Sequence, residues 1–130
     1  MSDNPNQITA DDARIRELML MNLFAVFNER DPERRMNAIE ANYTEDVIWT
    51  DPEKTFHGRE ELNNRAEELL DNLPDFVFTA AGPVHVLRDL GHLPFIHGVP
   101  EQPPAITGYD VALVRDGQIA VLYTPVNTGG

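Results

Sequence analysis

The sequence predicts an α+β fold in which a single concave, mostly antiparallel sheet wraps around three helices from the first half of the chain. Apolar residues recur at helical spacing in three segments before Pro74. Strand-like segments follow one another after residue 75, and the pair Asp116-Gly117 is typical of a hairpin turn. Helices gathered on one side of such a sheet define the α+β class.

The three helices are predicted from their caps and apolar stripes. The first spans residues 10–28, and Thr9 with Asp12 resembles a capping box at its start. The second opens at Asp31, the expected N-cap, with Pro32 at its first position, and ends near residue 42. The third follows Gly58, covers residues 59–72 and stops at Pro74. Each carries apolar residues on one side, which predicts that all three pack against the sheet.

The strands are predicted from short apolar runs between turn residues. Residues 47–51 form a short strand that Pro52 ends, and residues 55–57 form a very short one. Residues 76–79 and 84–87 read as one long strand, bent at residues 80–83. Residues 90–99, 106–115 and 118–126 complete the sheet. A concave sheet around helices leaves a pocket between them, and its other face needs cover, which predicts a two-fold dimer through that convex face.

Length and charge narrow the function classes. A chain of 130 residues predicts one domain, over residues 9–127, with flexible ends at residues 1–8 and 128–130. A net charge of −12 argues against nucleic acid and membrane surfaces as partners. No apolar run approaches the roughly 18–20 residues of a membrane span, and there is no signal-peptide pattern or cysteine. We expect a cytoplasmic protein.

Two aspartates occupy strand positions that are usually apolar. Asp51 ends the run from Val47, and Asp110 lies in the middle of residues 106–114. A buried, charged carboxylate without a partner is unfavourable, so each faces water, has a partner, or lines a cavity with a shifted pKa. Asp51 could also be a turn carboxylate that binds the backbone after it. Asp110 has no such local explanation, which makes it a candidate site residue.

Three segments resemble the nuclear transport factor 2-like superfamily, in its branch of SnoaL-like polyketide cyclases and ketosteroid isomerases. Residues 43–52 follow the spacing Y-x-x-D-x-x-x-x-D-P, residues 56–62 contain the G-x-x-x-L helix entry, and residues 108–119 match the D-V-x-x-x-R-D-G hairpin. The resemblance implies the cone-shaped sheet of that superfamily. It also implies general-base and oxyanion-donor roles for Asp51 and Asp110. Ketosteroid isomerases place a tyrosine near the position of Leu23, and this helix has none.

Two other branches imply different site residues. The SnoaL-like cyclases place a histidine on the strand before the acid, where His92 or His97 stands in this chain. Limonene-type epoxide hydrolases use an Asp-Arg-Asp relay, for which Arg88-Asp89 is the adjacent pair in a plausible strand. The four histidines lack metal-ligand spacing, so no metal or cofactor is expected.

The register of the last hairpin decides which face Asp110 occupies. A two-residue turn at Asp116-Gly117 would pair Asp110 with Tyr123, whereas a bulged loop with Gly117 in a left-handed conformation would pair it with Thr124. We favour the second register. It places Asp110 with Ala112, Leu122 and Thr124 on the pocket face, and it predicts an apolar opposite face formed by Tyr109, Val111, Leu113, Ile119, Val121 and Tyr123.

The sequence thus predicts a small-molecule pocket protein. Our first hypothesis is a cofactor-independent enzyme that transfers a proton on a hydrophobic carbonyl compound, as an isomerase or aldol-type cyclase. The alternatives are a non-catalytic dimeric ligand-binding module, an epoxide-hydrolase-like enzyme, and a dimerisation module whose pocket is only core. The expected ligand contacts come from the helices and from the pocket side of the strands: Leu23, Phe27, Trp49, Arg65, Leu69, Leu122 and Thr124.

Overall fold

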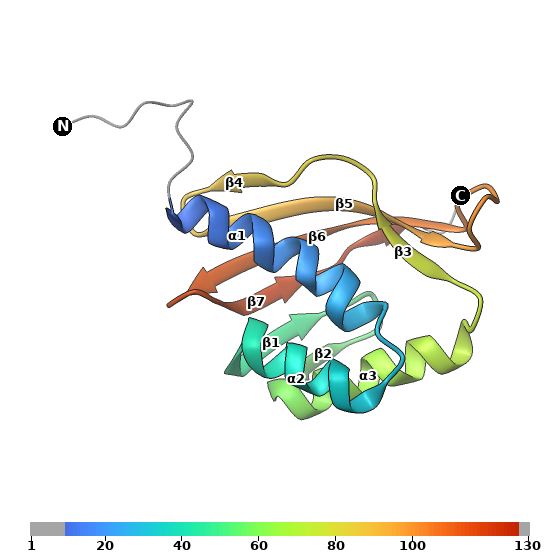
Figure 1. The fold of residues 1–130 in the computed structure, drawn as a ribbon, viewed down its shortest axis with the longest axis horizontal. Helices are drawn as coiled ribbons and strands as arrows, with labels where there is room; N and C mark the ends of the chain where they lie inside the picture. The colour runs from blue at the N-terminus through green and yellow to red at the C-terminus, as the bar shows by residue number, and fades with distance from the viewer. Residues whose placement is uncertain (1–9, 128–130) are drawn as a thin grey trace.

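A computed structural model describes residues 10–127 of the chain (Figure 1). The flexible ends predicted at residues 1–8 and 128–130, and the cap at Thr9, lie outside the described residues. The helical elements are α1 (Ala10–Met21), the π-helical turn η1 (Asn22–Phe27), α2 (Pro32–Asn42) and α3 (Gly58–Asn72). The strands are β1 (Tyr43–Thr50), β2 (Thr55–His57), β3 (Val77–Ala80), β4 (His85–Leu87), β5 (Leu90–Gly98), β6 (Ile106–Arg115), β7 (Gln118–Tyr123) and β8 (Val126–Asn127).

The strands form one curved, open sheet in the order β2-β1-β7-β6-β5-β3, with β4 also paired to β5 and β8 to β6. All pairs are antiparallel except β1 with β7, which is parallel. The predicted α+β class, with a mostly antiparallel sheet around helices, is therefore confirmed. The helices cover one face of the sheet: α1 crosses it, and α2 and α3 lie beside β1 and β2 (Figure 1).

The first helix has about the predicted length, but its last part is π-helical rather than α-helical. The expected range of residues 10–28 is filled by α1 and η1 together. The added residue per turn rotates the helix face, so that Asn22, Leu23, Val26 and Phe27 all point inward. Such π-turns concentrate at functional sites. The expected cap of α2 is also present, since the Asp31 side chain accepts from the Arg34 N–H at 2.8 Å.

Gly91 lets α1 lie directly on β5. A Cβ placed there would come within 2.8 Å of side-chain atoms of both Ile15 and Met19. Because real Cβ atoms do not approach so closely, the crossing of α1 over the sheet requires glycine at this position. The side chain of Asn28 then joins the end of η1 to the sheet, donating to the Phe78 carbonyl and accepting its N–H, both at 2.8 Å.

Three strand predictions need correction. The first strand begins at Tyr43 rather than at residue 47, and an irregularity in its pairing with β7 separates Tyr43 from Ile48. Residues 76–87 form two strands, β3 and β4, both antiparallel to β5, with the break at residues 81–84. The last predicted strand, residues 118–126, ends at Tyr123, and Val126 starts the separate pairing of β8 with β6.

The favoured register of the last hairpin is observed, but its cause differs from our prediction. Asp116 and Gly117 form a tight two-residue turn with positive φ angles of 53° and 79°. The bulge lies instead at Ala120, between the pairs Leu113–Val121 and Val114–Ile119. Val111 therefore pairs with Tyr123, which places Asp110 opposite Thr124. The bulge also turns Ile119 inward to full burial, so its predicted place on the outer face is wrong.

The core lies between the helices and the inner face of the sheet. It is formed by apolar side chains such as Leu18, Ile39, Leu62, Leu93 and Leu122, all of them buried. Within residues 10–127, no helix covers the opposite, outer face of the sheet (Figure 1). No helix among residues 10–127 is long and apolar enough to span a membrane.

Candidate functional site

A cavity of about 280 Å³ opens between η1, α3 and the inner face of the sheet. This volume is close to the lower end of small-molecule sites in proteins. Six polar or charged side chains line it together with a larger number of apolar ones. The polar residues are Asp51, Glu53, Arg65, His97, Asp110 and Thr124; the apolar ones are Leu23, Phe27, Trp49, Pro52, Leu69, Leu73, Phe78, Phe95, Ile106 and Val126.

Aromatic rings form one continuous wall of the cavity. Phe27 lies at the centre, with its ring 5.0 Å from that of Trp49 and 6.0 Å from that of Phe78. Phe78 in turn contacts Phe95 edge-on at 5.3 Å. Tilted and edge-on rings at these distances attract one another beyond the effect of buried area. The wall therefore offers ring faces and edges to a flat apolar molecule.

Asp110 is the buried carboxyl of this cavity, with an exposed fraction of only 2%. Its Oδ2 accepts from the Asn22 side-chain amide at 2.7 Å, and its Oδ1 accepts from the Thr124 hydroxyl at 2.8 Å. Burial raises the pKa of Asp110 from its ordinary value of 3.8 to about 7, against the opposing effect of these two hydrogen bonds. The carboxyl can therefore gain or lose a proton near neutral pH.

Each donor to Asp110 is itself oriented by a second donor. The buried Tyr43 hydroxyl donates to Oδ1 of Asn22, which turns the amide nitrogen of Asn22 toward Asp110. Burial, reinforced by the charge of Asp110, holds the pKa of Tyr43 well above its ordinary value, so the phenol keeps its proton. On the other side, the Trp49 indole N–H donates to the Thr124 hydroxyl oxygen at 3.0 Å. Both arms of this network therefore point their hydrogens toward Asp110.

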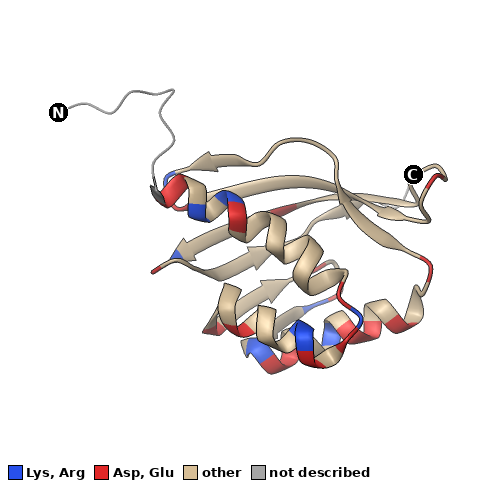
Figure 2. Cartoon of the chain, in the orientation of Figure 1, with Lys and Arg blue, Asp and Glu red and all other residues tan. Residues whose placement is uncertain are grey.

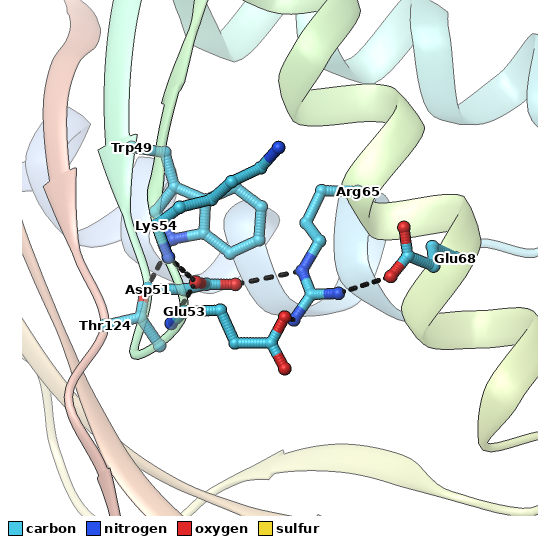
Figure 3. A network of polar contacts seen from close by, with 7 residues as sticks. All are labelled: Trp49, Asp51, Glu53, Lys54, Arg65, Glu68 and Thr124. Carbon is cyan, nitrogen blue, oxygen red and sulfur yellow. Dashed lines mark hydrogen bonds and ion pairs between the residues drawn. The ribbon is translucent and has the colours of Figure 1, made fainter.

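Asp51 also lines the cavity, but its oxygens are already in use (Figure 3). Its Oδ1 accepts the backbone N–H groups of Glu53 and Lys54 at 2.8 and 3.0 Å, as in an Asx turn. Its Oδ2 accepts from Arg65 Nε at 2.9 Å. The structure thus combines the local turn that the sequence allowed with a partly buried ion pair. Asp51 holds the β1–β2 turn against α3.

Arg65 sits among three carboxylates. Besides Asp51, its Nη1 binds Glu68 at 2.7 Å and its Nη2 lies 3.3 Å from Glu53 (Figure 3). Burial by itself lowers the pKa of the guanidinium, but the hydrogen bond and charge of Asp51, with the charges of Glu53 and Glu68, raise it overall. Arg65 therefore stays charged, and each of its three nitrogens already faces a carboxylate.

The two candidate histidines of β5 lie on opposite faces of the sheet. His97 is buried in the cavity wall and stacks on Phe78 with ring centroids 3.7 Å apart. Burial, with the charge of Arg30, lowers the pKa of His97 to about 4, so its ring is neutral at neutral pH. His92 pairs with Val111 and lies against Tyr109 on the outer face. The structure does not bring His92 to the cavity.

Most of the other expected contacts reach the cavity. Leu23, Phe27, Trp49, Leu69 and Thr124 line it, as does Arg65. Leu122 is fully buried in the core and does not line it. The pair proposed for an epoxide-hydrolase relay, Arg88 and Asp89, is exposed in the turn between β4 and β5 and is also outside the cavity.

Sequence reasoning missed Asn22 and Tyr43, which the structure places in the network around Asp110. The signal for Asn22 was an amide inside an otherwise apolar helix, where a buried polar group needs a partner. The signal for Tyr43 was only its place as the first residue of the Y-x-x-D-x-x-x-x-D-P spacing. Within residues 10–127, no group of three or more His, Asp or Glu side chains has the arrangement of a metal site.

Comparisons with known proteins agree with this fold. A family model described as the SnoaL-like domain matches residues 21–122. No curated protein matches the sequence. Among solved structures, a candidate isomerase of the SnoaL-like family from Agrobacterium tumefaciens superposes with a TM-score of 0.81 at 20% identity, over 88% of this chain and 98% of that one.

Two further solved structures share the fold at lower identity. A candidate SnoaL-like polyketide cyclase from Jannaschia gives a TM-score of 0.74 at 12% identity, covering 98% of this chain and 91% of the other. A candidate ketosteroid isomerase from Kribbella flavida gives 0.71 at 16% identity, covering 91% and 81%. At these identities the likeness establishes the fold alone.

Proposed function

The chain belongs to the SnoaL-like domain family, and from this premise we propose that it is an enzyme whose Asp110 transfers a proton on a small, mainly apolar carbonyl compound. One observation carries the proposal: a carboxyl with a pKa near neutrality lies in an apolar cavity that can hold a ligand. General acid–base groups work best when their pKa is near the working pH. Perturbed carboxyls in clefts are typical of such sites.

The proposed step is simple. The Asp110 carboxylate takes a proton from the carbon next to the carbonyl, and the electron pair moves to the carbonyl oxygen as an enolate. If a C=C bond adjoins the deprotonated carbon, the intermediate is a dienolate, and return of the proton from Asp110 to its far carbon gives an isomerisation. If the molecule holds a second carbonyl, attack of the enolate carbon on it forms a carbon–carbon bond and an alkoxide that takes the proton from Asp110, which gives an aldol-type cyclisation. His97, neutral and lining the same cavity, is the proposed donor to the enolate oxygen.

Asp51 has a positioning role in this proposal. Its two oxygens are held by the turn and by Arg65. With three hydrogen bonds accepted, Asp51 keeps at most one further acceptor position, on the oxygen that is paired with Arg65. The proton transfer is therefore assigned to Asp110 rather than shared between the two aspartates.

The experiment that tests the proposal measures proton exchange. The protein is incubated in D2O with a panel of small aromatic and alicyclic ketones, and uptake of deuterium next to the carbonyl is followed by NMR. We expect catalysed exchange with at least one ketone, and a loss of about 100-fold or more in Asp110→Asn. Exchange that is unchanged in Asp110→Asn would refute the role of Asp110.

A non-catalytic ligand-binding module is the second candidate, and one observation favours it. Because Asp51 and Glu53 are both paired with Arg65, Asp110 is the one carboxyl among the three that line the cavity without a cationic partner. A protein of this kind would bind the ketones without exchanging their protons. The same D2O experiment, combined with a binding measurement, separates the two candidates.

We also propose that two copies associate through the outer face of the sheet. Tyr109 and Tyr123 are half exposed there, at 50% and 51%, beside the partly exposed Val111 and Val121. The sheet carries few charged residues, which lie mostly on the helices and loops (Figure 2). A self-complementary apolar face of this kind suits a two-fold dimer.

A further inference from the structure

We propose that the cavity selects uncharged aromatic carbonyl compounds and rejects carboxylates, because the Arg65 cluster at its wall is already saturated with negative charge. This inference rests on the proposed function, since it specifies the ligand of the same cavity. An arginine that lines a ligand cavity would ordinarily indicate a site for an anion. The contacts of Arg65 lead to the opposite conclusion.

The nitrogens of Arg65 are distributed among carboxylates of the protein itself. Nε binds Asp51, Nη1 binds Glu68 and Nη2 faces Glu53, at 2.9, 2.7 and 3.3 Å. The side chain of Asp51 is only 4% exposed, so a ligand that displaced it would leave a buried charge without its partner. A carboxylate ligand would therefore have to compete with an ion pair that the protein has already formed.

The sum of the nearby charges is negative. Asp51, Glu53 and Glu68 carry three negative charges against the single positive charge of Arg65 (Figure 3). Lys54 adds one positive charge, but its ammonium lies 5.2 Å above the Phe56 ring, and Phe56 does not line the cavity. An incoming anion therefore meets net repulsion from this wall.

Arg30, the cation near His97, is also engaged. Its Nη1 donates to the Leu70 carbonyl at 2.9 Å, and its Nη2 faces the carbonyls of Leu73 and Phe76, both at 3.4 Å. These contacts join the end of α3 to the segment that leads into β3. Arg30 does not line the cavity, so its charge is not presented directly to a ligand. Asp110, once ionised, adds a further negative charge inside.

The apolar wall completes the description of the ligand. Rings of Phe27, Trp49, Phe78 and Phe95 surround a volume of about 280 Å³, which suits one or two fused rings. A ketone carbonyl needs only a hydrogen-bond donor, whereas a carboxylate needs a counter-charge. The cavity can meet the first need and not the second.

The test compares two probes of the same shape, 2-acetylnaphthalene and 2-naphthoate. Trp49 is the single tryptophan of the chain, so its indole N–H gives one NMR signal that reports binding at the cavity wall. At pH 7.5 we expect the ketone to bind at least 10-fold more tightly than the carboxylate. In Glu53→Gln/Glu68→Gln we expect the ratio of the naphthoate Kd to the ketone Kd to fall at least 3-fold, because naphthoate binds more tightly to this variant.

The matched control is Glu33→Gln/Glu60→Gln, which changes the net charge equally at exposed helix positions away from the cavity. In this control variant, the ratio of the naphthoate Kd to the ketone Kd should stay at the wild-type value. The inference is overturned if naphthoate binds as tightly as the ketone, if neither probe shifts the indole signal, or if the two double variants behave alike. Charge selectivity without deuterium exchange would refute the proposed catalysis but not this inference. Deuterium exchange without charge selectivity would refute this inference but not the proposed catalysis.

Discussion

The side-chain amide of Asn22 donates a hydrogen bond of 2.7 Å to Asp110, joining the first residue of the π-helical turn to the middle of β6. The two residues are 88 positions apart in the chain. The Tyr43 hydroxyl fixes the orientation of this amide by donating to its oxygen. Asn22 therefore reaches Asp110 from the π-helical turn, and its hydrogen bond lowers the pKa of Asp110 against the larger effect of burial.

Asn22→Leu should raise the pKa of Asp110 by about one to two units, because a hydrogen bond to the charged form is lost. Tyr43→Phe should raise it less and should destabilise the fold by about 1–3 kcal/mol, because the buried oxygen of Asn22 loses its donor. The pKa is measured from the side-chain carboxyl carbon shift in a pH titration by NMR. Asn37→Leu, at an exposed position on α2, is the control. If the pKa of Asp110 were unchanged in Asn22→Leu, the proposed effect of this hydrogen bond would be contradicted.

His97 and Asp110 should give opposite dependences of stability on pH. Between about pH 4 and 7 the folded state keeps a proton on Asp110 that the unfolded chain releases, so this group makes the free energy of unfolding fall as pH rises. Between about pH 4 and 6.5 the unfolded chain binds a proton at His97 that the folded state does not. This group therefore makes the free energy of unfolding rise as pH rises.

Single variants should separate the two slopes. In Asp110→Asn, where His97 remains, the free energy of unfolding should rise from pH 4 to 6.5. In His97→Phe, where Asp110 remains, it should fall between pH 4 and 7. The full shift in the pKa of Asp110 corresponds to a fall of about 4 kcal/mol. Urea unfolding at a series of pH values, followed by circular dichroism, measures both. Parallel curves for the two variants would show that neither group titrates as described.

The sequence was sufficient for the elements that depend on local signals. Asp31-Pro32 begins α2, and Asp116-Gly117 forms the last hairpin turn, because capping and positive φ angles are properties of a few adjacent residues. Asp110 could be identified as a candidate for the same reason, since an acid in the middle of an apolar strand is visible in the sequence. Thr124 could be placed opposite Asp110 from the register of the hairpin, but the hydrogen bond from Asn22 could not, because Asn22 lies 88 positions away in the chain.

Two local irregularities limited the rest of the prediction. Apolar periodicity assumes a constant number of residues per turn, and the π-turn breaks this at Asn22, which thereby faces inward. The bulge at Ala120 has no glycine or other turn residue that marks it in the sequence, whereas Gly117 is a typical residue for a bulged loop. Asp51 illustrates the converse case. Its local turn was predictable from Pro52, but the ion pair with Arg65 depends on how α3 packs.

The ion pair between Asp51 and Arg65 should stabilise the fold without contributing to proton transfer. Arg65→Met leaves the nearly buried Asp51 charge unpaired and should reduce the free energy of unfolding by about 3 kcal/mol. Asp51→Asn keeps an oxygen for the turn and should lose about 1 kcal/mol. The double variant should be more stable than Arg65→Met alone, as urea unfolding would reveal.

The deuterium-exchange rate of Asp51→Asn distinguishes a positioning role from a catalytic one. We expect it to stay within a few-fold of wild type, measured at a temperature where the variant remains folded. A loss as large as that of Asp110→Asn would assign the base to Asp51 and contradict the division of roles proposed above.

The outer face of the sheet should mediate dimerisation. Tyr109→Glu/Tyr123→Glu places two charges on this face, where burying them in an interface would be strongly unfavourable, so the protein should become monomeric. Sedimentation equilibrium measures the mass, with 14.6 kDa expected for the variant and twice that for wild type. Phe24→Glu is the control, because Phe24 is similarly exposed, at 45%, but lies on η1 away from the sheet face, so this variant should remain dimeric. A wild-type protein that sediments as a monomer at micromolar concentration would refute the interface.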